Sequence, residues 1–214
     1  LNIYKNSNAT KLYFSLNNKK TDCYFKGNKV YFKNKTLFRI KNQSDIMKYN
    51  IASAVIAAKL LLIPNKSIKK SIKNFGFLKY RLQEVYKGIY NDAKSTNIYS
   101  TISALKEFNN DLFLICGGYD RKEEISGLEK YLTNIKKVFA YGETKEKISL
   151  YFKKKKIEVF TFDTLKDATL NALNVRKKEI ILYSPMFASY DQYNSFEERG
   201  KEFNQIIKKY YDLV

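Results

Sequence analysis

The sequence predicts an α/β fold: a Rossmann-like, mostly parallel sheet with helices on both faces, preceded by a partial domain made of an antiparallel meander and two helices. Beyond Phe75, short apolar strands alternate with amphipathic helical segments, and parallel strands need such crossover connections. Before that residue, aromatic and β-branched runs follow one another closely, separated by turn residues. We therefore expect a boundary between Asn74 and Leu78.

The meander is expected between Thr10 and Ile40. Its four strands are predicted at KLYFSL, DCYFKG, KVYFK and TLFRI, and Gly27–Asn28 forms the turn between the second strand and the third. The strands are rich in the aromatic and β-branched residues that suit a pleated, half-buried surface.

Two helices follow the meander. The first is predicted from Asp45 to Leu62 and ends before Pro64, because proline has no amide proton to continue a helix. Its buried face is expected to consist of Ile46, Ala54, Ala57 and Leu61. The second helix is shorter and is predicted over about Lys66 to Lys73.

Five strands are predicted for the main sheet, at GIYND, DLFLICG, KKVFAYG, IEVFTF and EIILYS. Helical segments of about ten to fifteen residues are expected to connect them. The lysine run at 153–156 is predicted to lie at a helix C-terminus, where cations favour the helix dipole.

Composition excludes several classes of protein. The chain has no His, which rules out the usual zinc sites and Ser-His or Cys-His nucleophiles. Cys23 and Cys116 are far apart in apolar surroundings, so we expect two buried, reduced thiols. No apolar run is long enough to cross a bilayer and no secretory signal opens the chain, so we expect a cytoplasmic protein without a membrane partner. We also expect a monomer.

The formal net charge of +19 raises the question of an anionic partner. The excess is nearly all Lys, spread along the chain together with Asn, Ile and Tyr, a pattern that AT-rich codons produce. No basic arm or aromatic RNA-binding signature accompanies it. We therefore interpret the lysines as a solvated surface and expect no nucleic-acid partner.

Three loops carry the candidate chemistry, because ligands of doubly wound folds collect at the carboxyl ends of the strands. The first, NDAKSTN, brings Lys, Asp and hydroxyl groups to a helix N-terminus, which is a natural anion site but also an ordinary capping loop. The second, GGYDR, pairs two glycines with Asp120 and Arg121, and a turn explains the glycines equally well. The third runs from SPMFASYD to SFEERG, where Glu197 and Glu198 suit a helix N-terminus.

In order and spacing, the segments FGFLKYRLQEV, GIYNDAKSTN, LICGGYDR and YSPMFASYDQYNSFEERGKEF resemble motifs of the Mur ligase family, most of all its D-glutamate-adding members. KYNIASAVIAAKLLLIP is similar to the HNxxNxxAA helix of that family. The resemblance covers most of the chain and is loose over the first forty residues. It implies an ATP-dependent ligase of peptidoglycan synthesis that joins D-glutamate to UDP-N-acetylmuramoyl-L-alanine through an acyl phosphate.

By position, the resemblance implies that D-glutamate is held by Lys94, Thr96, Arg121, Ser189 and Phe196. Fixed cations and hydroxyl donors are what a dicarboxylate needs, and Lys94 with Arg121 supplies two positive charges from neighbouring strand ends. Arg121 stands where many members of the family have Lys, which keeps the charge and alters the reach.

For ATP, the resemblance implies contacts from Asn50, Ser53, Arg81 and Asp92. Tyr49, Ser53 and Tyr80 depart from the family, which has His, Asn and His there. The sequence lacks the GxxxxGK[ST] phosphate loop and the family's carbamylated-lysine and metal site, so no metal-binding residue is assigned, and we expect this chain alone to be inactive. Residues 1–76 correspond to the end of the central ATPase domain, and 77–214 to the amino-acid-binding domain; Mg²⁺ and ATP serve the full-length parent.

Two alternatives remain. A sibling Mur ligase or a folylpolyglutamate ligase shares the architecture and takes a different substrate. A non-catalytic basic module that grips an acidic ligand or nucleic acid would use the same loops, and its binding would weaken steeply with salt.

Overall fold

The computed structural model describes residues 7–41, 43, 45–75 and 78–212, with the side chain of Ile46 left aside. The chain divides into two compact units, 1–76 and 77–214. Each unit has its own core, and each is described by itself. Across the described residues, no helix has the length and apolar character needed to span a bilayer.

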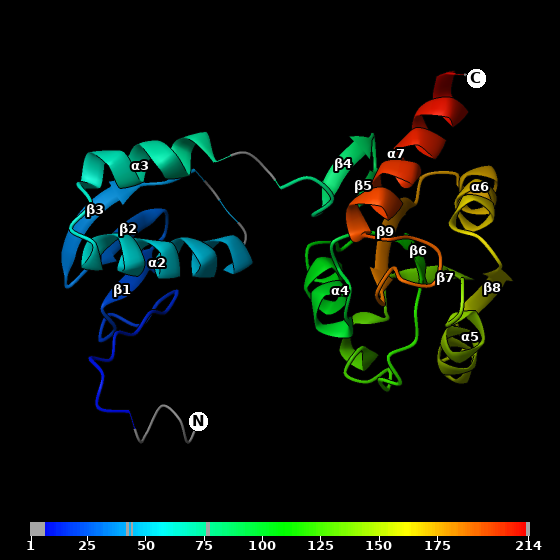
Figure 1. Cartoon of the computed structure of the whole chain (residues 1–214), viewed down its shortest axis with the longest axis horizontal. Coiled ribbons are helices and arrows are strands. Elements are labelled where there is room, and N and C mark those ends of the chain that lie inside the picture. The colour runs from blue at the N-terminus through cyan, green and yellow to red at the C-terminus, as the bar shows by residue number, and fades with distance from the viewer. Residues whose placement is uncertain (1–6, 42, 44, 76–77, 213–214) are drawn as a thin grey trace. The chain divides into compact units, whose positions relative to one another are not determined.

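Unit 1 is a three-stranded antiparallel sheet with two helices (Figure 1), namely β1 (Cys23–Lys26), β2 (Lys29–Phe32), β3 (Lys35–Arg39), α2 (Asp45–Leu60) and α3 (Asn65–Asn74). The turn at Gly27–Asn28 joins β1 to β2, and Gly27 has φ +59° as a tight hairpin requires. Lys33 and Asn34 both have positive φ and turn the chain between β2 and β3.

The meander has three strands within the described residues, so the strand predicted at KLYFSL is wrong. That segment makes a single parallel bridge, between Phe14 and Cys23. The physical reason lies in residues 17–22. Thr21 donates to the carbonyl of Asn18 through both its amide and its hydroxyl, which closes a local turn. Beyond this turn the segment meets β1 through a few backbone hydrogen bonds, from the Ser15 amide to the Cys23 carbonyl and from the Phe25 amide to the Leu16 carbonyl, and it does not extend into a strand.

The buried face of α2 also differs from the prediction. Ala54 and Ala57 are exposed and Leu61 is 74% exposed, whereas Ile51, Ala52 and Val55 pack on the sheet with Ile68 of α3. Both sets have helical spacing, and the larger β-branched side chains bury more apolar area, so they take the core side. The fourth predicted residue, Ile46, has its side chain outside the described part.

Unit 2 is a six-stranded sheet with helices on both faces (Figure 1), comprising β4 (Gln83–Tyr86), β5 (Ile89–Asn91), α4 (Ile98–Leu105), β6 (Leu112–Gly117), η1 (Glu129–Tyr131), β7 (Ile135–Tyr141), α5 (Lys145–Lys154), β8 (Glu158–Phe162), α6 (Leu165–Val175), β9 (Ile180–Met186) and α7 (Phe196–Asp212). The strand order is β4-β5-β9-β6-β7-β8. All pairs are parallel except β4 with β5. The mostly parallel α/β fold predicted from the sequence is confirmed.

Alternation along β6 explains the two layers of helices. Leu112, Leu114 and Cys116 point into a core shared with α4 and α5, while Phe113 and Ile115 point into a core shared with α6 and α7. Strands that are buried on both faces read as continuous apolar runs, which is why LFLIC was recognisable.

Two features of unit 2 were not anticipated. β4 is an antiparallel edge strand in RLQEVY, where Gln83 and Glu84 make the pattern too polar to stand out. The connection from β6 to β7 carries only a 3-10 turn among its described residues, where a helix was expected. Gly127 has φ +78° in this connection, and the side chain of the buried Leu128 packs into the core, where a helix was expected to pack. The lysine run lies at the C-terminus of α5 as predicted, with Lys153 and Lys154 in its last turn, and both cysteines are buried and free.

Candidate functional site

The three candidate loops follow neighbouring strands. β5, β9 and β6 lie side by side and parallel, so the segments after Asn91, Met186 and Gly117 leave the sheet at one edge. This is the edge where ligands bind in doubly wound folds.

Asn91 and Asp92 tie the first loop to the body of unit 2 and are both buried. The Asn91 amide donates to the Gly200 carbonyl at 2.8 Å and to Asn204 Oδ1 at 2.6 Å, both on α7. Asp92 Oδ2 accepts from the hydroxyls of Ser95 and of Ser184, the latter at 2.8 Å. Asp92 thus fixes the first loop to β9.

The carboxylate of Asp92 also holds the segment before β4. Its Oδ1 accepts from the Leu82 amide at 3.1 Å, which places the exposed Arg81 beside the loop. Burial raises the pKa of Asp92 from 3.8 to about 6, although the hydrogen bonds from Ser95 and Ser184 and the charge of Arg81 oppose the shift. The carboxylate is buried and its hydrogen bonds are to protein groups, so its role in the folded chain is to fix the conformation of the loop.

We expect Asp92→Asn to change how stability depends on pH. Because the folded-state pKa lies above the unfolded value, the contribution of Asp92 to the free energy of unfolding is present below about pH 4 and is lost as the pH rises to about 6. The variant has no such loss, so the wild type should fall relative to it by roughly 3 kcal/mol across this window. Urea denaturation at a series of pH values measures the difference, with the exposed Glu123→Gln as control. A difference that is independent of pH would contradict the assignment.

The other polar residues of the first loop fall into two groups, those that cap a helix or hold the loop and those that are left to contact a ligand. Asn97 is the N-cap of α4, and its side chain accepts from the Ser100 amide at 2.9 Å. Capping therefore accounts for Asn97, and Asp92 accounts for Ser95. Lys94 and Thr96 remain, and the Lys94 ammonium lies 5.1 Å from the centre of the Phe196 ring.

The two glycines after β6 bring the second loop against the third. Gly117 and Gly118 have φ of +152° and +141°, and an added Cβ on either would collide with a backbone carbonyl, of Tyr141 or of Ala188. The Tyr119 amide then donates to the Ala188 carbonyl at 2.9 Å. Gly118 thus permits the close approach of the second loop to the third, and Gly117, the last residue of β6, permits the close approach to Tyr141 of β7.

The third loop leads into α7 through a capped N-terminus. Ser195 Oγ accepts from the Glu198 amide at 3.2 Å, and Glu198 accepts from the Asn194 amide at 2.9 Å. The capping interpretation of Glu198 is therefore correct. The cap fixes the first residue of the helix, Phe196, at the edge of the sheet.

Together the loops enclose a cavity of about 280 Å³, lined by Thr96, Arg121, Ala188, Ser189, Tyr190, Asn194, Ser195, Phe196 and Glu197. The Arg121 guanidinium lies 5.9 Å from the centre of the Tyr190 ring. Four of the five residues predicted for an amino-acid ligand thus line one cavity. The fifth, Lys94, contacts the Phe196 ring that forms part of its wall.

Arg199 organises this cavity and was missed in the sequence. Its side chain is fully buried, and its guanidinium donates to the carbonyls of Ala93 (3.3 Å), Phe187 (3.0 Å) and Ala188 (3.0 Å). One buried arginine therefore joins the residue before Lys94 to the residues before Ser189. A signal was present, because Arg199 has the i, i+4 and i+8 spacing of the buried Phe203 and Ile207.

Asp191 supplies the nearby negative charge. Burial raises its pKa, and the positive charge of Arg199 opposes that shift. Asp191 Oδ2 accepts from the Glu143 amide at 3.3 Å, while Asp191 Oδ1 and Arg199 Nε are the buried side-chain atoms without a hydrogen-bond partner within the described part of the chain.

The residues predicted for a nucleotide fall in both units. Asn50 and Ser53 are exposed on α2, and the Ser53 hydroxyl donates to the Asn50 carbonyl at 2.9 Å. Arg81 is exposed in unit 2, where it could meet a phosphate, and Asp92 is buried behind it. Over residues 7–41, 43, 45–75 and 78–212, no three carboxylate or thiol groups gather into one cluster.

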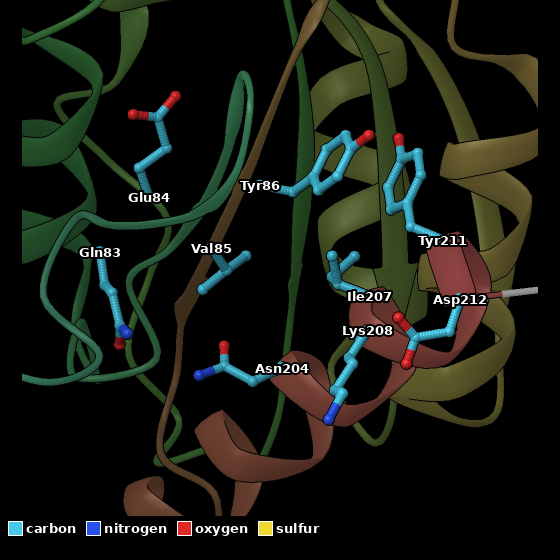
Figure 2. A pocket seen from close by; sticks show the side chains of 9 residues that line it. All are labelled: Gln83, Glu84, Val85, Tyr86, Asn204, Ile207, Lys208, Tyr211 and Asp212. Carbon is cyan, nitrogen blue, oxygen red and sulfur yellow. The ribbon is translucent and has the colours of Figure 1, made fainter.

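A second cavity, of about 460 Å³, lies between β4 and α7 (Figure 2) and is lined by Gln83, Glu84, Val85, Tyr86, Asn204, Ile207, Lys208, Tyr211 and Asp212. Tyr86 and Tyr211 stack there, with ring centres 3.7 Å apart. α7 begins at the carboxyl ends of the strands and runs back along the sheet (Figure 1), and Asn204 of this groove accepts from the Asn91 amide at 2.6 Å, so the groove borders the base of the first loop. None of the predicted site residues lines it.

The chain is similar in sequence to curated ligases. UDP-N-acetylmuramoylalanine–D-glutamate ligase of Oenococcus oeni is 34% identical over 213 residues, which cover 95% of this chain and 49% of the relative. The enzyme of the same name from Lactococcus lactis subsp. lactis is 35% identical, covering 97% of this chain and 48% of the relative. The chain is homologous to the Mur ligases. The family resemblance predicted from the loop segments is confirmed.

The fold of this Mur ligase homologue is likewise shared. A pseudomurein peptide ligase type C from Methanothermus fervidus superimposes with a TM-score of 0.67 at 17% identity, covering 89% of this chain and 42% of that one. No protein-family model matches the chain. The chain spans about half the length of the curated relatives it matches.

Proposed function

We propose that this chain is the D-glutamate-binding part of a UDP-N-acetylmuramoylalanine–D-glutamate ligase. Residues 77–214 would be its amino-acid-binding domain, and residues 1–76 the end of its central domain. The observation that carries the proposal is the cavity lined by Thr96, Arg121, Ser189 and Phe196, with Lys94 against the Phe196 ring. Relatives that carry this name match nearly the whole chain.

The lining suits a small dicarboxylate with an amino group. Arg121 and Lys94 offer two cations for two carboxylates, and Arg121 can bind one of them in a bidentate manner. The hydroxyls of Thr96, Ser189 and Ser195 are further donors. Glu197 also lines the cavity, and its carboxylate could attract the ammonium group of the ligand. The volume of about 280 Å³ is near the low end for small-molecule sites, as a single amino acid requires.

In the parent enzyme, the γ-phosphoryl group of ATP would pass to the carboxylate of UDP-N-acetylmuramoyl-L-alanine. The amine of D-glutamate would then attack the acyl carbon, forming the amide bond and releasing phosphate. The task of this chain is to hold D-glutamate by its carboxylates so that its amine, once it has lost its proton, can reach the acyl carbon. Positioning of this kind is a large share of what an enzyme supplies to such a reaction.

Arg81 is the residue best placed to meet a nucleotide, because its exposed guanidinium can pair with a phosphate while Asp92 fixes the backbone beside it. We assign Asn50 and Ser53 to ATP on their family positions alone. The ligands for Mg²⁺ and the phosphate loop would come from other parts of the parent. We therefore expect the chain by itself to release no ADP, and we place the parent in the cytoplasm with its nucleotide substrates.

Titration of the labelled chain with D-glutamate, followed by NMR, tests the proposal. We expect saturable shifts confined to the amides of Thr96, Arg121, Ser189 and their neighbours. D-alanine lacks the second carboxylate and should bind at least about ten-fold more weakly, because a charge-assisted hydrogen bond is lost. Equal affinity for both amino acids, or shifts centred on β4 and the end of α7, would reject a dicarboxylate site in these loops.

A further inference from the structure

The positive charge of the chain is concentrated in unit 1. Residues 1–76 contain 16 Lys and Arg against 2 acidic residues, whereas residues 77–214 contain 24 against 19. The formal charges are therefore +14 and +5. The denser charge lies on the smaller unit.

Codon bias does not explain this contrast. Lysine is frequent in both units, as a genome-wide preference would make it, and the units differ in their acidic residues instead. Codons for Asp and Glu are also rich in A and T, so the same preference would not remove them from one unit. The two acidic residues of unit 1 are engaged locally: Asp22 accepts from the Tyr13 amide at 2.8 Å, and Asp45 lies 3.6 Å from Lys48.

α3 presents its lysines as one stripe. Lys66, Lys69, Lys70 and Lys73 are exposed and have the i, i+3, i+4 and i+7 spacing of a single helix face, while Ile68 packs into the core on the other side. The helix contains no acidic residue. Like charges at this spacing repel one another and weaken the helix, so the stripe does not serve the stability of unit 1.

Apolar side chains stand exposed in the turn that precedes the stripe. Leu60, Leu61 and Leu62 are 63%, 74% and 87% exposed. The Ile63 amide donates to the Ala58 carbonyl and the Leu62 amide to the Lys59 carbonyl, which is the pattern of a Schellman motif.

Leu62 occupies the left-handed position of this motif with φ +57°, where glycine is the favoured residue. A large apolar side chain is thus exposed at a position whose left-handed backbone conformation disfavours any residue with a Cβ atom. The fold of the turn gives no reason for leucine here.

We propose that the stripe on α3 and the turn at 60–63 form a docking surface for the surface of a lipid bilayer rich in anionic lipid. Lysines attract anionic headgroups, and each contributes a few-fold to binding. Aliphatic side chains gain from entering the boundary between headgroups and acyl chains. Nucleic acid would be attracted by the lysines alone and gives no role to three exposed leucines, so the combination favours a bilayer.

This surface lies in unit 1 and uses none of the residues assigned to D-glutamate, so it stands independently of the proposed function. It revises the expectation of no membrane partner, which rested on the lack of a spanning segment. Peripheral docking needs no such segment, because charge and a shallow apolar contact can suffice.

Vesicle sedimentation of the full chain tests the proposal. We expect binding to vesicles of phosphatidylcholine mixed equally with phosphatidylglycerol, and little binding to phosphatidylcholine alone. Replacing the four stripe lysines by glutamine should weaken binding by roughly 600-fold, at about five-fold for each lysine. The matched control replaces the exposed lysines 153–156, which removes the same charge from unit 2, and should change binding by only a few-fold.

The variant Leu62→Gly distinguishes a bilayer-binding surface from a nucleic-acid-binding surface. It should raise the melting temperature of unit 1 by relieving the left-handed leucine, yet weaken vesicle binding several-fold. Binding of a duplex DNA should not change. Loss of vesicle binding equal in both lysine variants would show a general charge effect and overturn the proposal. DNA binding tighter than vesicle binding, with no effect of Leu62→Gly on either, would overturn it in favour of nucleic acid.

Discussion

Replacing Arg199 by methionine is expected to destabilise unit 2 by about 3 kcal/mol or more, the largest single-residue effect on stability that we predict. Methionine fills much of the same space but donates no hydrogen bond. The carbonyls of Ala93, Phe187 and Ala188 would lose their guanidinium partner. Each buried acceptor without a partner costs about 1–3 kcal/mol, and Asp191 would lose the charge that stabilises its ionised form.

Urea denaturation followed by circular dichroism measures this effect, and amide hydrogen exchange in β6 and β9 assigns it to unit 2. Lys201→Met is the matched control, because Lys201 is exposed two residues along the same helix and the change removes the same charge. An Arg199→Met midpoint equal to that of the control would mean that the three loops hold their positions without the arginine.

The sheet and the meeting of the three loops at one edge were predictable because both follow from sequence patterns that can be recognised without knowledge of distant contacts. Strands buried on both faces are continuously apolar, and parallel connectivity sends their following segments to one edge. The sequence positions of Lys94, Arg121 and Ser189 after such strands therefore predict that the three residues lie near one another. That these residues bind D-glutamate stays a prediction.

The burial of Arg199, the buried face of α2 and the burial of Asp92 depend on contacts with distant segments of the chain, which the local sequence does not identify. A charged residue in a helix is normally solvent-exposed, so the local sequence does not predict the burial of Arg199, which depends on three carbonyl acceptors from distant segments. On α2, two apolar sets had helical spacing, and the sheet selected Ile51 and Val55 over Ala54. Asp92 was assigned to a nucleotide by position, and its burial adds a structural role that spacing alone does not reveal.

Loss of either cation at the cavity is expected to weaken D-glutamate binding by roughly 10- to 100-fold, and loss of both by on the order of 1,000-fold. The two charges come from separate loops that Arg199 and the paired glycines bring together, so each is expected to act on a different carboxylate. Arg121→Met removes the guanidinium beside Tyr190, and Lys94→Met removes the ammonium over the Phe196 ring. Methionine keeps the apolar stem of both side chains and isolates the effect of charge.

Lys122→Met is the matched control for these variants, because Lys122 is the exposed neighbour of Arg121 and does not line the cavity. Calorimetric titration with D-glutamate gives the affinities, and titration with D-glutamine identifies the cation that serves the side-chain carboxylate. D-glutamine already lacks that carboxylate, so one of the two variants should bind it as well as the wild type does. In the full-length parent, the same variants should raise KM for D-glutamate and leave KM for ATP unchanged. If Arg121→Met and Lys122→Met weaken binding alike, the cavity attracts the ligand through net charge alone, and the assignment of individual carboxylates is wrong.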